Sequence, residues 1–283
     1  MLRRKGVYKK EYIARMFDSC SDVGSLYDAM IPLPDGSGRK SKLLNIVSGV
    51  SDGERNIEDF LAEKILALKD SNGNGIKELL KNHFESNPVK IRGAGYNPMH
   101  DSAKISFNSN SIRRENNIVR LLYKEKAKLN GESTIKNAIG EIIDYEIPLS
   151  EGKKNNIDML AKTNDHINIV EWKTDSASCS DSLLRAAMEI TTYEYELNKR
   201  KLLEDFRLDE EGYDENSFKK IVAIFDGTKP AITYKNIRGN GFGNIAKLIE
   251  YLDINVVVLS RNSVVDKITN DTTIEECDIK LAY

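Results

Sequence analysis

The chain has 283 residues, of which 40% are hydrophobic and 30% are charged, and its formal net charge is −2. This composition supplies a packed core and excludes wholesale disorder, and the near-neutral charge excludes a globally basic nucleic-acid-binding surface. No apolar run approaches the ~18 residues of a membrane span, and no apolar stretch follows the basic N-terminus, so we expect neither a membrane anchor nor a secretory signal. The three cysteines are far apart, which favours a reducing, cytoplasmic compartment over a disulfide or zinc framework.

The first part of the chain, residues 1–100, is predicted to be a mainly helical region. Apolar residues recur at helical spacing over residues 57–68 and again over residues 76–84. A stretch rich in glycine and proline, Arg92–Pro98, marks the boundary with a second domain at residues 101–283.

The second domain begins with a helical pattern and continues with a mixture of strands and helices. In chain order the pattern predicts a helix over Ser111–Asn130, strands over Glu141–Leu149, Asn156–Thr163 and Ile167–Thr174, a helix over Asp181–Lys201, a strand over Ile221–Phe225, a helix over Gly243–Leu252 and a strand over Ile254–Leu259. This order predicts an α/β (α+β) fold with a mixed sheet flanked by helices.

Charged residues stand at the end of the third predicted strand. Glu171 and Lys173 share one face of it, whereas Val170 and Trp172 take the other. The strand is otherwise apolar on both faces, as a central strand is. Because placing a carboxylate and an ammonium group in such surroundings costs free energy, we expect the pair to serve a function.

The second predicted strand supplies another carboxylate. If the second and third strands pair as a hairpin, Asp158 falls opposite Glu171, because the midpoint between them lies in the turn at Asn164 and Asp165. Two clustered carboxylates can hold a hard divalent cation such as Mg²⁺, which polarises a phosphoryl oxygen and activates water. A lysine beside that cation, here Lys173, can orient or deprotonate the water.

At these residues the sequence resembles the PD-(D/E)XK nuclease superfamily, which has the restriction-endonuclease-like fold. The resemblance covers roughly Ser111 to Leu259, and its core is Asp158 followed by Glu171-Trp172-Lys173. It implies that Asp158 and Glu171 bind Mg²⁺, with Mn²⁺ able to substitute, together with the main-chain carbonyl of Trp172. It also implies that Asp158, Glu171 and Lys173 are the catalytic residues.

Two helices carry further expected site residues. The resemblance places a supporting metal ligand on the helix before the first strand, where Glu115 matches by position and Glu125 is a rival. On the helix after the third strand, Arg185, Glu189 and Tyr193 form one stripe in the place of a RecB-type motif, and they are expected to support the site or to contact the substrate.

The chain departs from the family pattern at two positions. Ile157 stands where many members have proline, and Glu189 stands where the RecB-type motif has glutamine. The second departure puts only the RecB-type subgroup in doubt.

The resemblance implies a metal-dependent nuclease, exonuclease or endonuclease, that acts on DNA. Residues 1–110 have 17 Lys and Arg against 14 Asp and Glu, and with this positive balance the helical N-terminal region is expected to help hold the substrate. The basic cluster at Arg3–Lys10 is by itself interpreted as a solvated face. A catalytically silent nucleic-acid-binding module of the same fold is the alternative.

Two other motifs indicate different functions. Gly49–Gly53 matches the nucleophile elbow of serine hydrolases, but Ser51 and Glu54 also match a helix capping box, which we favour. Gly239–Gly243 precedes a helix and can contact a phosphate, although a plain connecting loop is the preferred interpretation.

Overall fold

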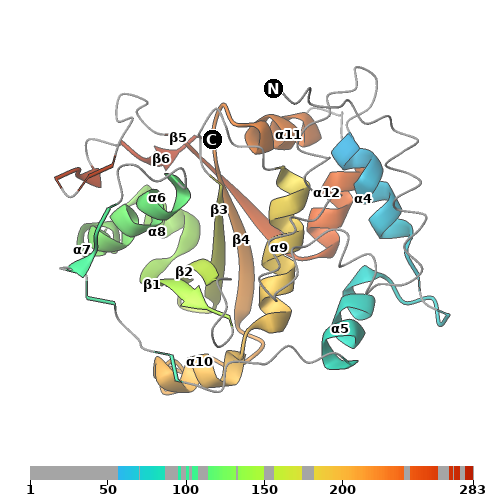
Figure 1. Cartoon of the computed structure of the whole chain (residues 1–283), viewed down its shortest axis with the longest axis horizontal. Coiled ribbons are helices and arrows are strands. Elements are labelled where there is room, and N and C mark those ends of the chain that lie inside the picture. Colours follow the sequence, from blue (N-terminus) through green and yellow to red (C-terminus); the bar gives the residue numbers. More distant parts are fainter. Residues whose placement is uncertain are drawn as a thin grey trace, which may run out of the picture.

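The computed structural model describes residues 57–69, 71–86, 95–96, 100–101, 104–107, 114–131, 133–149, 156–173, 182–238, 243–260, 268–269, 271–274 and 278–282. Within these ranges six strands form one mixed sheet that is flanked by nine helices (Figure 1), which confirms the predicted α/β (α+β) class. None of the helices in these ranges has the length and apolar character needed to cross a membrane.

The six strands lie side by side in their order along the chain. The first three form an antiparallel meander, β3, β4 and β5 are parallel, and β6 returns antiparallel at the edge. The predicted hairpin between the second and third strands is confirmed, since the Thr163 N–H donates to the His166 carbonyl across its turn at 2.8 Å. The strands are β1 (Glu141–Pro148), β2 (Asn156–Lys162), β3 (Ile167–Lys173), β4 (Phe218–Phe225), β5 (Ile254–Ser260) and β6 (Lys280–Leu281).

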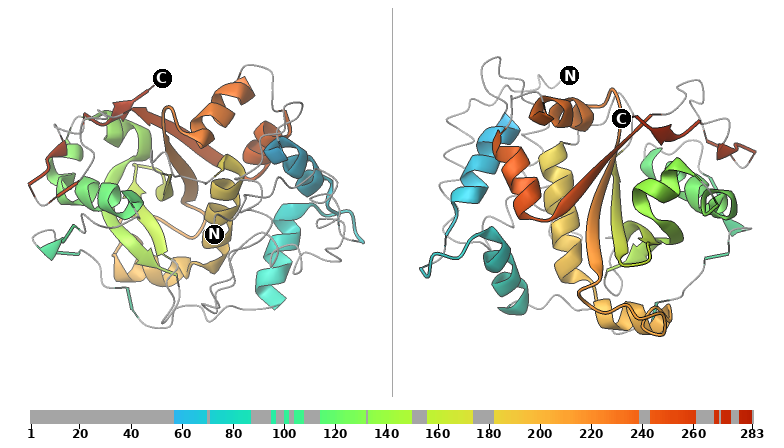
Figure 2. Two further views of the ribbon diagram at one scale, coloured as in Figure 1. Left: turned by 45° about the horizontal axis from the view of Figure 1, so that its top comes forward. Right: turned by 180° about the vertical axis from the view of Figure 1, so that it is seen from behind.

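Helices cover both faces of the sheet, and each face has its own apolar core (Figures 1 and 2). One face, here called the α6 face, packs against α6 (Arg114–Lys124), α7 (Lys126–Leu129) and α8 (Thr134–Ile139). The other, here called the α9 face, is covered by α4 (Ile57–Ala67), α5 (Ile76–Ser86), α9 (Leu183–Glu196), α10 (Lys199–Asp205), α11 (Lys229–Arg238) and α12 (Gly243–Tyr251).

Two of the predicted helices were wrong in extent, because each is two helices. The predicted helix over Ser111–Asn130 is interrupted at Glu125, which separates α6 from α7. The predicted helix over Asp181–Lys201 ends at Glu196, and Asn198 then caps α10 by accepting a hydrogen bond from the Lys201 N–H at 3.1 Å. In both cases the helical spacing of apolar residues continues across the break, so periodicity alone predicts one long helix instead of two shorter ones. Helices α8 and α11 were not predicted.

The first turn of α4 connects the N-terminal region to the rest of the molecule. The Glu58 carboxylate accepts a hydrogen bond from the Leu184 N–H in the first turn of α9, and Asp59 accepts from the N–H groups of Asn244 and Ile245 at the start of α12. Carboxylates at helix N-termini satisfy otherwise unpaired N–H groups and interact favourably with the helix dipole. These contacts fix the start of α9, the helix that carries part of the candidate site.

Candidate active site

The end of β3 places the predicted acid and base on the α9 face. Ile167 and Ile169 of this strand pack in the α9-face core, so Glu171 and Lys173, at the same alternation, point the same way. Trp172 packs in the α6-face core against Phe225. Glu171 and Lys173 are only 5% and 3% exposed, so both charged groups are withdrawn from bulk water.

Asp158 meets β3 at the point where β2 separates from it. The main-chain pairing of the two strands ends at Met159 and Val170, and the next N–H of β3 on this side, that of Trp172, donates to Asp158 Oδ2 at 2.8 Å. In an extended strand the N–H and C=O of one residue point to the same side, so the Trp172 carbonyl also points toward the β2 side. The predicted meeting of Asp158 and Glu171 is therefore confirmed as geometry.

The pKa of Glu171 agrees with a position close to Asp158. Burial raises the pKa of Glu171 well above its ordinary value, and the nearby Asp158 carboxylate raises it further, while Lys173 acts in the opposite direction. A cation between Asp158 and Glu171 would relieve this repulsion.

Lys173 joins the sheet to α9. Its Nζ donates to Glu171 Oε1 at 2.7 Å and to Glu189 Oε2 at 2.8 Å. The second oxygen of Glu189 accepts from Arg185 Nε, also at 2.8 Å, one turn earlier on the same helix. Burial raises the pKa of Glu189, but Lys173 and Arg185 outweigh burial and lower it to about 2. Glu171, Lys173, Glu189 and Arg185 thus form a chain of alternating charges.

Tyr193 completes the predicted stripe on α9. Burial raises the pKa of its phenol well above the ordinary value, and the carboxylates of Glu171 and Glu189 raise it further, so the hydroxyl stays protonated beside them. Arg185, Glu189 and Tyr193 are therefore brought together with the end of β3, as predicted from their spacing.

The donor atoms suit a hard divalent cation. Glu171 Oε2 is buried and has no hydrogen-bond partner among the described residues, and an unpaired buried carboxylate oxygen costs free energy unless a ligand satisfies it. Carboxylate and carbonyl oxygens are the ligands that Mg²⁺ prefers. Within the described ranges no group of three or more Asp, Glu, His or Cys side chains could hold a metal ion, and Asp158 and Glu171 supply only two carboxylates.

The structure describes the side chain of only one of the two candidates for a supporting ligand. Glu115 belongs to α6, but its side chain lies outside the described part of the chain. Glu125 stands at the break between α6 and α7 and forms an ion pair with Lys128 at 3.0 Å.

A residue that the sequence reasoning missed lies next to Asp158. Glu146 of β1 falls opposite Asp158, because Tyr145 pairs with Met159 and Ile147 with Ile157. Its φ of +49° is in the left-handed region. The signal that could have found it is the turn at residues 152–155, since a hairpin centred on Gly152 places these two acids opposite each other.

Other predicted sites are remote or lie outside the description. A cavity of about 650 Å³ opens at the other end of the sheet, among residues such as Asn168, Lys219 and Ile254, and contains none of the predicted site residues. The Ser51 motif, the basic cluster at Arg3–Lys10 and the glycine loop over residues 239–242 all fall outside the described ranges.

Comparisons with protein-family models, with curated proteins and with solved structures found no match for this chain.

Proposed function

We propose that this protein is a metal-dependent nuclease that hydrolyses DNA phosphodiester bonds. The observation that carries the proposal is the buried Glu171 oxygen without a hydrogen-bond partner, beside Asp158 and an ion-paired lysine. A carboxylate pair that repels itself in a buried place is stabilised by a divalent cation, and the same cation can serve phosphodiester hydrolysis.

Each residue has a role that follows from its contacts. Asp158, Glu171 and the Trp172 carbonyl would hold Mg²⁺ or Mn²⁺, with Glu115 as a proposed supporting ligand. The ion would polarise the scissile phosphate and lower the pKa of an attacking water. Lys173 is held by Glu171 and Glu189, which keeps its ammonium group in place to position that water and to stabilise negative charge.

Neighbouring residues on α9 support this arrangement. Arg185 is partly exposed and fixes Glu189, and Tyr193 keeps its hydroxyl group protonated beside the carboxylates. Because both side chains lie beside the acidic residues at the end of β3, we propose that they contact the substrate or support the site.

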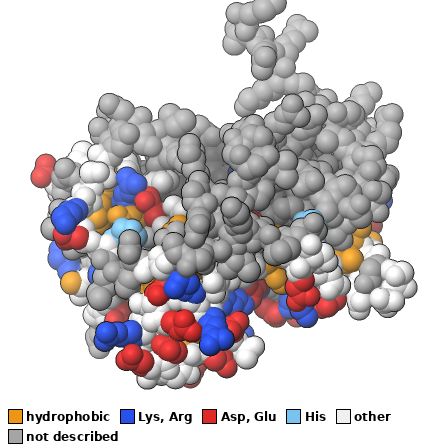
Figure 3. All heavy atoms as spheres, turned by 60° about the horizontal axis from the view of Figure 1, so that its bottom comes forward, with side chains coloured by type: hydrophobic (Ala, Val, Ile, Leu, Met, Phe, Trp, Pro, Cys, Tyr) orange, Lys and Arg blue, Asp and Glu red, His pale blue; other side chains and the backbone are white. Residues whose placement is uncertain are grey.

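The substrate is proposed to approach at the end of the sheet where β3 finishes. On the face that Figure 3 shows, acidic and basic side chains of the described residues are interspersed. Interspersed charges give little net attraction for a polyanion, so the described residues of this face are not proposed to bind DNA.

A cleavage assay tests the proposal. The substrates are linear duplex, circular duplex and single-stranded DNA, each with Mg²⁺, with Mn²⁺ and with EDTA. The proteins are the wild type, Lys173→Ala and, as a matched control, Lys162→Ala, which removes a lysine that pairs with Glu211 at the opposite end of β2. We expect metal-dependent cleavage that falls at least about 10²-fold in Lys173→Ala and persists in Lys162→Ala.

The outcomes separate the alternatives. Cleavage of the circle indicates an endonuclease, and cleavage of linear ends alone indicates an exonuclease. Cleavage that survives Lys173→Ala contradicts the proposed site. DNA binding without cleavage on any substrate contradicts the enzyme and favours the catalytically silent binding module.

A further inference from the structure

The side chains of β1 and β2 switch from one face of the sheet to the other at the same cross-strand position. Tyr145 and Met159, a cross-strand pair, pack in the α6-face core, whereas Ile147 and Ile157, the pair two residues further on, pack in the α9-face core. In a regular strand residues two apart share a face. Both strands are therefore rotated about their own axes between these two pairs, where Glu146 lies opposite Asp158.

The backbone of Glu146 accounts for the rotation on β1. Four of the described non-glycine residues have a left-handed backbone, and Glu146, with a φ of +49°, is the one of them that lies inside a strand. The others, such as Arg207, stand in turns. This conformation is unfavourable for a residue with a Cβ atom, and it persists only where surrounding contacts enforce it.

Helix α6 provides those contacts. Arg120 donates to both Glu146 oxygens, from Nε to Oε1 at 3.1 Å and from Nη2 to Oε2 at 3.3 Å, and Asn116 donates to Oε1 at 3.2 Å. The Arg120 side chain is 26% exposed and that of Glu146 is 23% exposed, so this ion pair is partly shielded from water. Three donated hydrogen bonds thus anchor the carboxylate of a strand residue whose backbone is strained.

The rotation has a consequence for the candidate site. Because β2 turns at Asp158 together with β1, the Asp158 carboxylate reaches along the sheet to the Trp172 N–H. We infer that Glu146 is a positioning residue, whose left-handed backbone, held by Arg120 and Asn116, aims Asp158 at the metal position. This inference rests on the proposed function.

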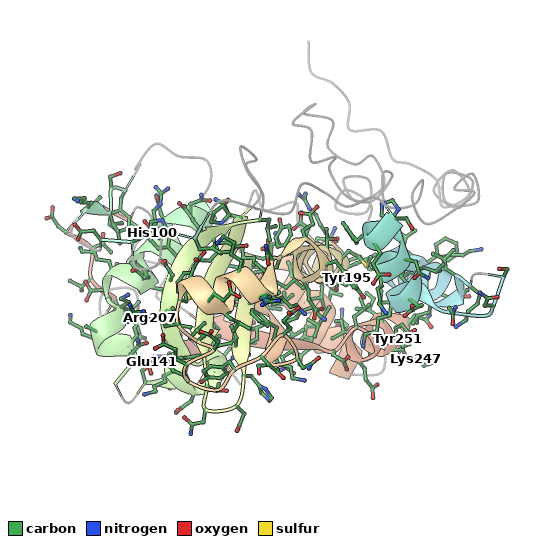
Figure 4. The ribbon with its side chains drawn as sticks, turned by 90° about the horizontal axis from the view of Figure 1, so that it is seen from below. His100, Glu141, Tyr195, Arg207, Lys247 and Tyr251 are labelled. Atoms are coloured by element: carbon green, nitrogen blue, oxygen red, sulfur yellow. The ribbon has the colours of Figure 1, made fainter. Side chains whose placement is uncertain are left out.

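Two substitutions at one position separate the backbone from the carboxylate. Glu146→Ala and Glu146→Gly both remove the carboxylate, but only glycine adopts φ near +49° without strain. The readout is the dissociation constant for Mn²⁺ alone, from calorimetric titration of the full chain. The matched controls are Arg207→Ala and Arg207→Gly, because Arg207, which Figure 4 labels, also has a left-handed backbone (φ +55°) but is exposed and stands outside the strands, in the turn after α10. Thermal unfolding followed by the single tryptophan, Trp172, checks that each variant is folded.

We expect Mn²⁺ to bind Glu146→Ala at least tenfold more weakly than the wild type. We expect Glu146→Gly to bind Mn²⁺ within about threefold of the wild type, because glycine can keep the left-handed backbone at this position and with it the rotation of the two strands. Both Arg207 variants should bind Mn²⁺ as the wild type does. Wild-type affinity in Glu146→Ala would overturn the inference while leaving the metal site standing. Equal losses in the alanine and glycine variants would also overturn it, because they would assign the effect to the carboxylate. A wild type that binds no Mn²⁺ would overturn the metal site proposed above, and the inference with it.

Discussion

Glu189 is the residue through which the β3 end of the site and helix α9 are joined. Both of its oxygens accept from cations, Lys173 and Arg185, at 2.8 Å, although the side chain is almost fully buried. A glutamine here, as in the RecB-type motif, would replace one of these two accepting oxygens by an NH₂ group, which cannot accept from a cation, and would remove the negative charge. The carboxylate thus suits a site in which an arginine stands one turn before it.

Replacing Glu189 by glutamine should destabilise the protein. The variant removes the acidic side chain that pairs with both Lys173 and Arg185. We therefore expect the free energy of unfolding at pH 7 to fall by about 1–3 kcal/mol. Because the folded pKa of Glu189 is about 2, below the ordinary 4.5, its stabilisation is complete above pH 4.5 and is lost as the pH falls toward 2. Urea denaturation of Glu189→Gln and of the wild type at pH 7 and at pH 3 measures both effects.

The control for this variant is Glu204→Gln in α10. Glu204 also pairs with an arginine one turn away, Arg200, but both side chains are exposed. An exposed pair contributes little, so the change should stay below about 0.5 kcal/mol. Equal effects in the two variants would show that the buried charge chain around Lys173 does not contribute to stability.

At the scale of the elements, helix α4 contacts α9 through a buried acid, Glu58. Glu58 is 1% exposed, and burial raises its pKa to about 7, while Lys229 and the Leu184 N–H act in the opposite direction. The folded state therefore holds this proton more tightly than the unfolded chain does. The contribution of Glu58 to stability is complete below pH 4.5 and is lost as the pH rises through about 7.

Glu58→Gln should remove this pH dependence, because glutamine can still accept from the Leu184 N–H but does not ionise. At pH 5 the variant and the wild type should have similar free energies of unfolding. At pH 8 the variant should be the more stable by up to about 3 kcal/mol, the equivalent of the shift in pKa. Thermal and urea unfolding at both pH values measure the difference, and a constant difference between the curves would contradict the buried-acid explanation.

Elements also show what the sequence could predict and what it could not. The hairpin of β2 and β3 followed from alternation and one turn, which placed Asp158 beside Glu171, and the spacing of Arg185, Glu189 and Tyr193 gave their common stripe. These are local rules with fixed periods. The breaks at Glu125 and Leu197 could not be predicted, because apolar spacing continues across them. The left-handed backbone of Glu146 depends on Arg120, a contact between two elements that no local pattern contains.

At the scale of the whole molecule, the sheet is covered on both faces, and the candidate site lies on the α9 face at the end of β3. Both parallel connections, from β3 to β4 and from β4 to β5, pass through helices of the α9 face (Figure 2). Helices α4 and α5 from the N-terminal region add buried residues to this same core, among them Leu61, Ile65 and Phe84. This shared core predicts that α4 and the sheet unfold together.

Leu61→Ala tests that prediction. Leu61 is fully buried in the α9-face core, and such a truncation costs about 2–5 kcal/mol. Trp172, the single tryptophan, lies in the core of the opposite face and so reports on unfolding of the sheet. If the described part of the N-terminal region and the sheet form one cooperative unit, the urea midpoint from Trp172 fluorescence should fall by the same amount as the midpoint from circular dichroism. The control Glu63→Ala, at an exposed position of the same helix, should move neither midpoint by more than the equivalent of about 0.5 kcal/mol. An unchanged fluorescence midpoint beside a lowered dichroism midpoint would instead show that α4 unfolds apart from the sheet, as an independent N-terminal domain would.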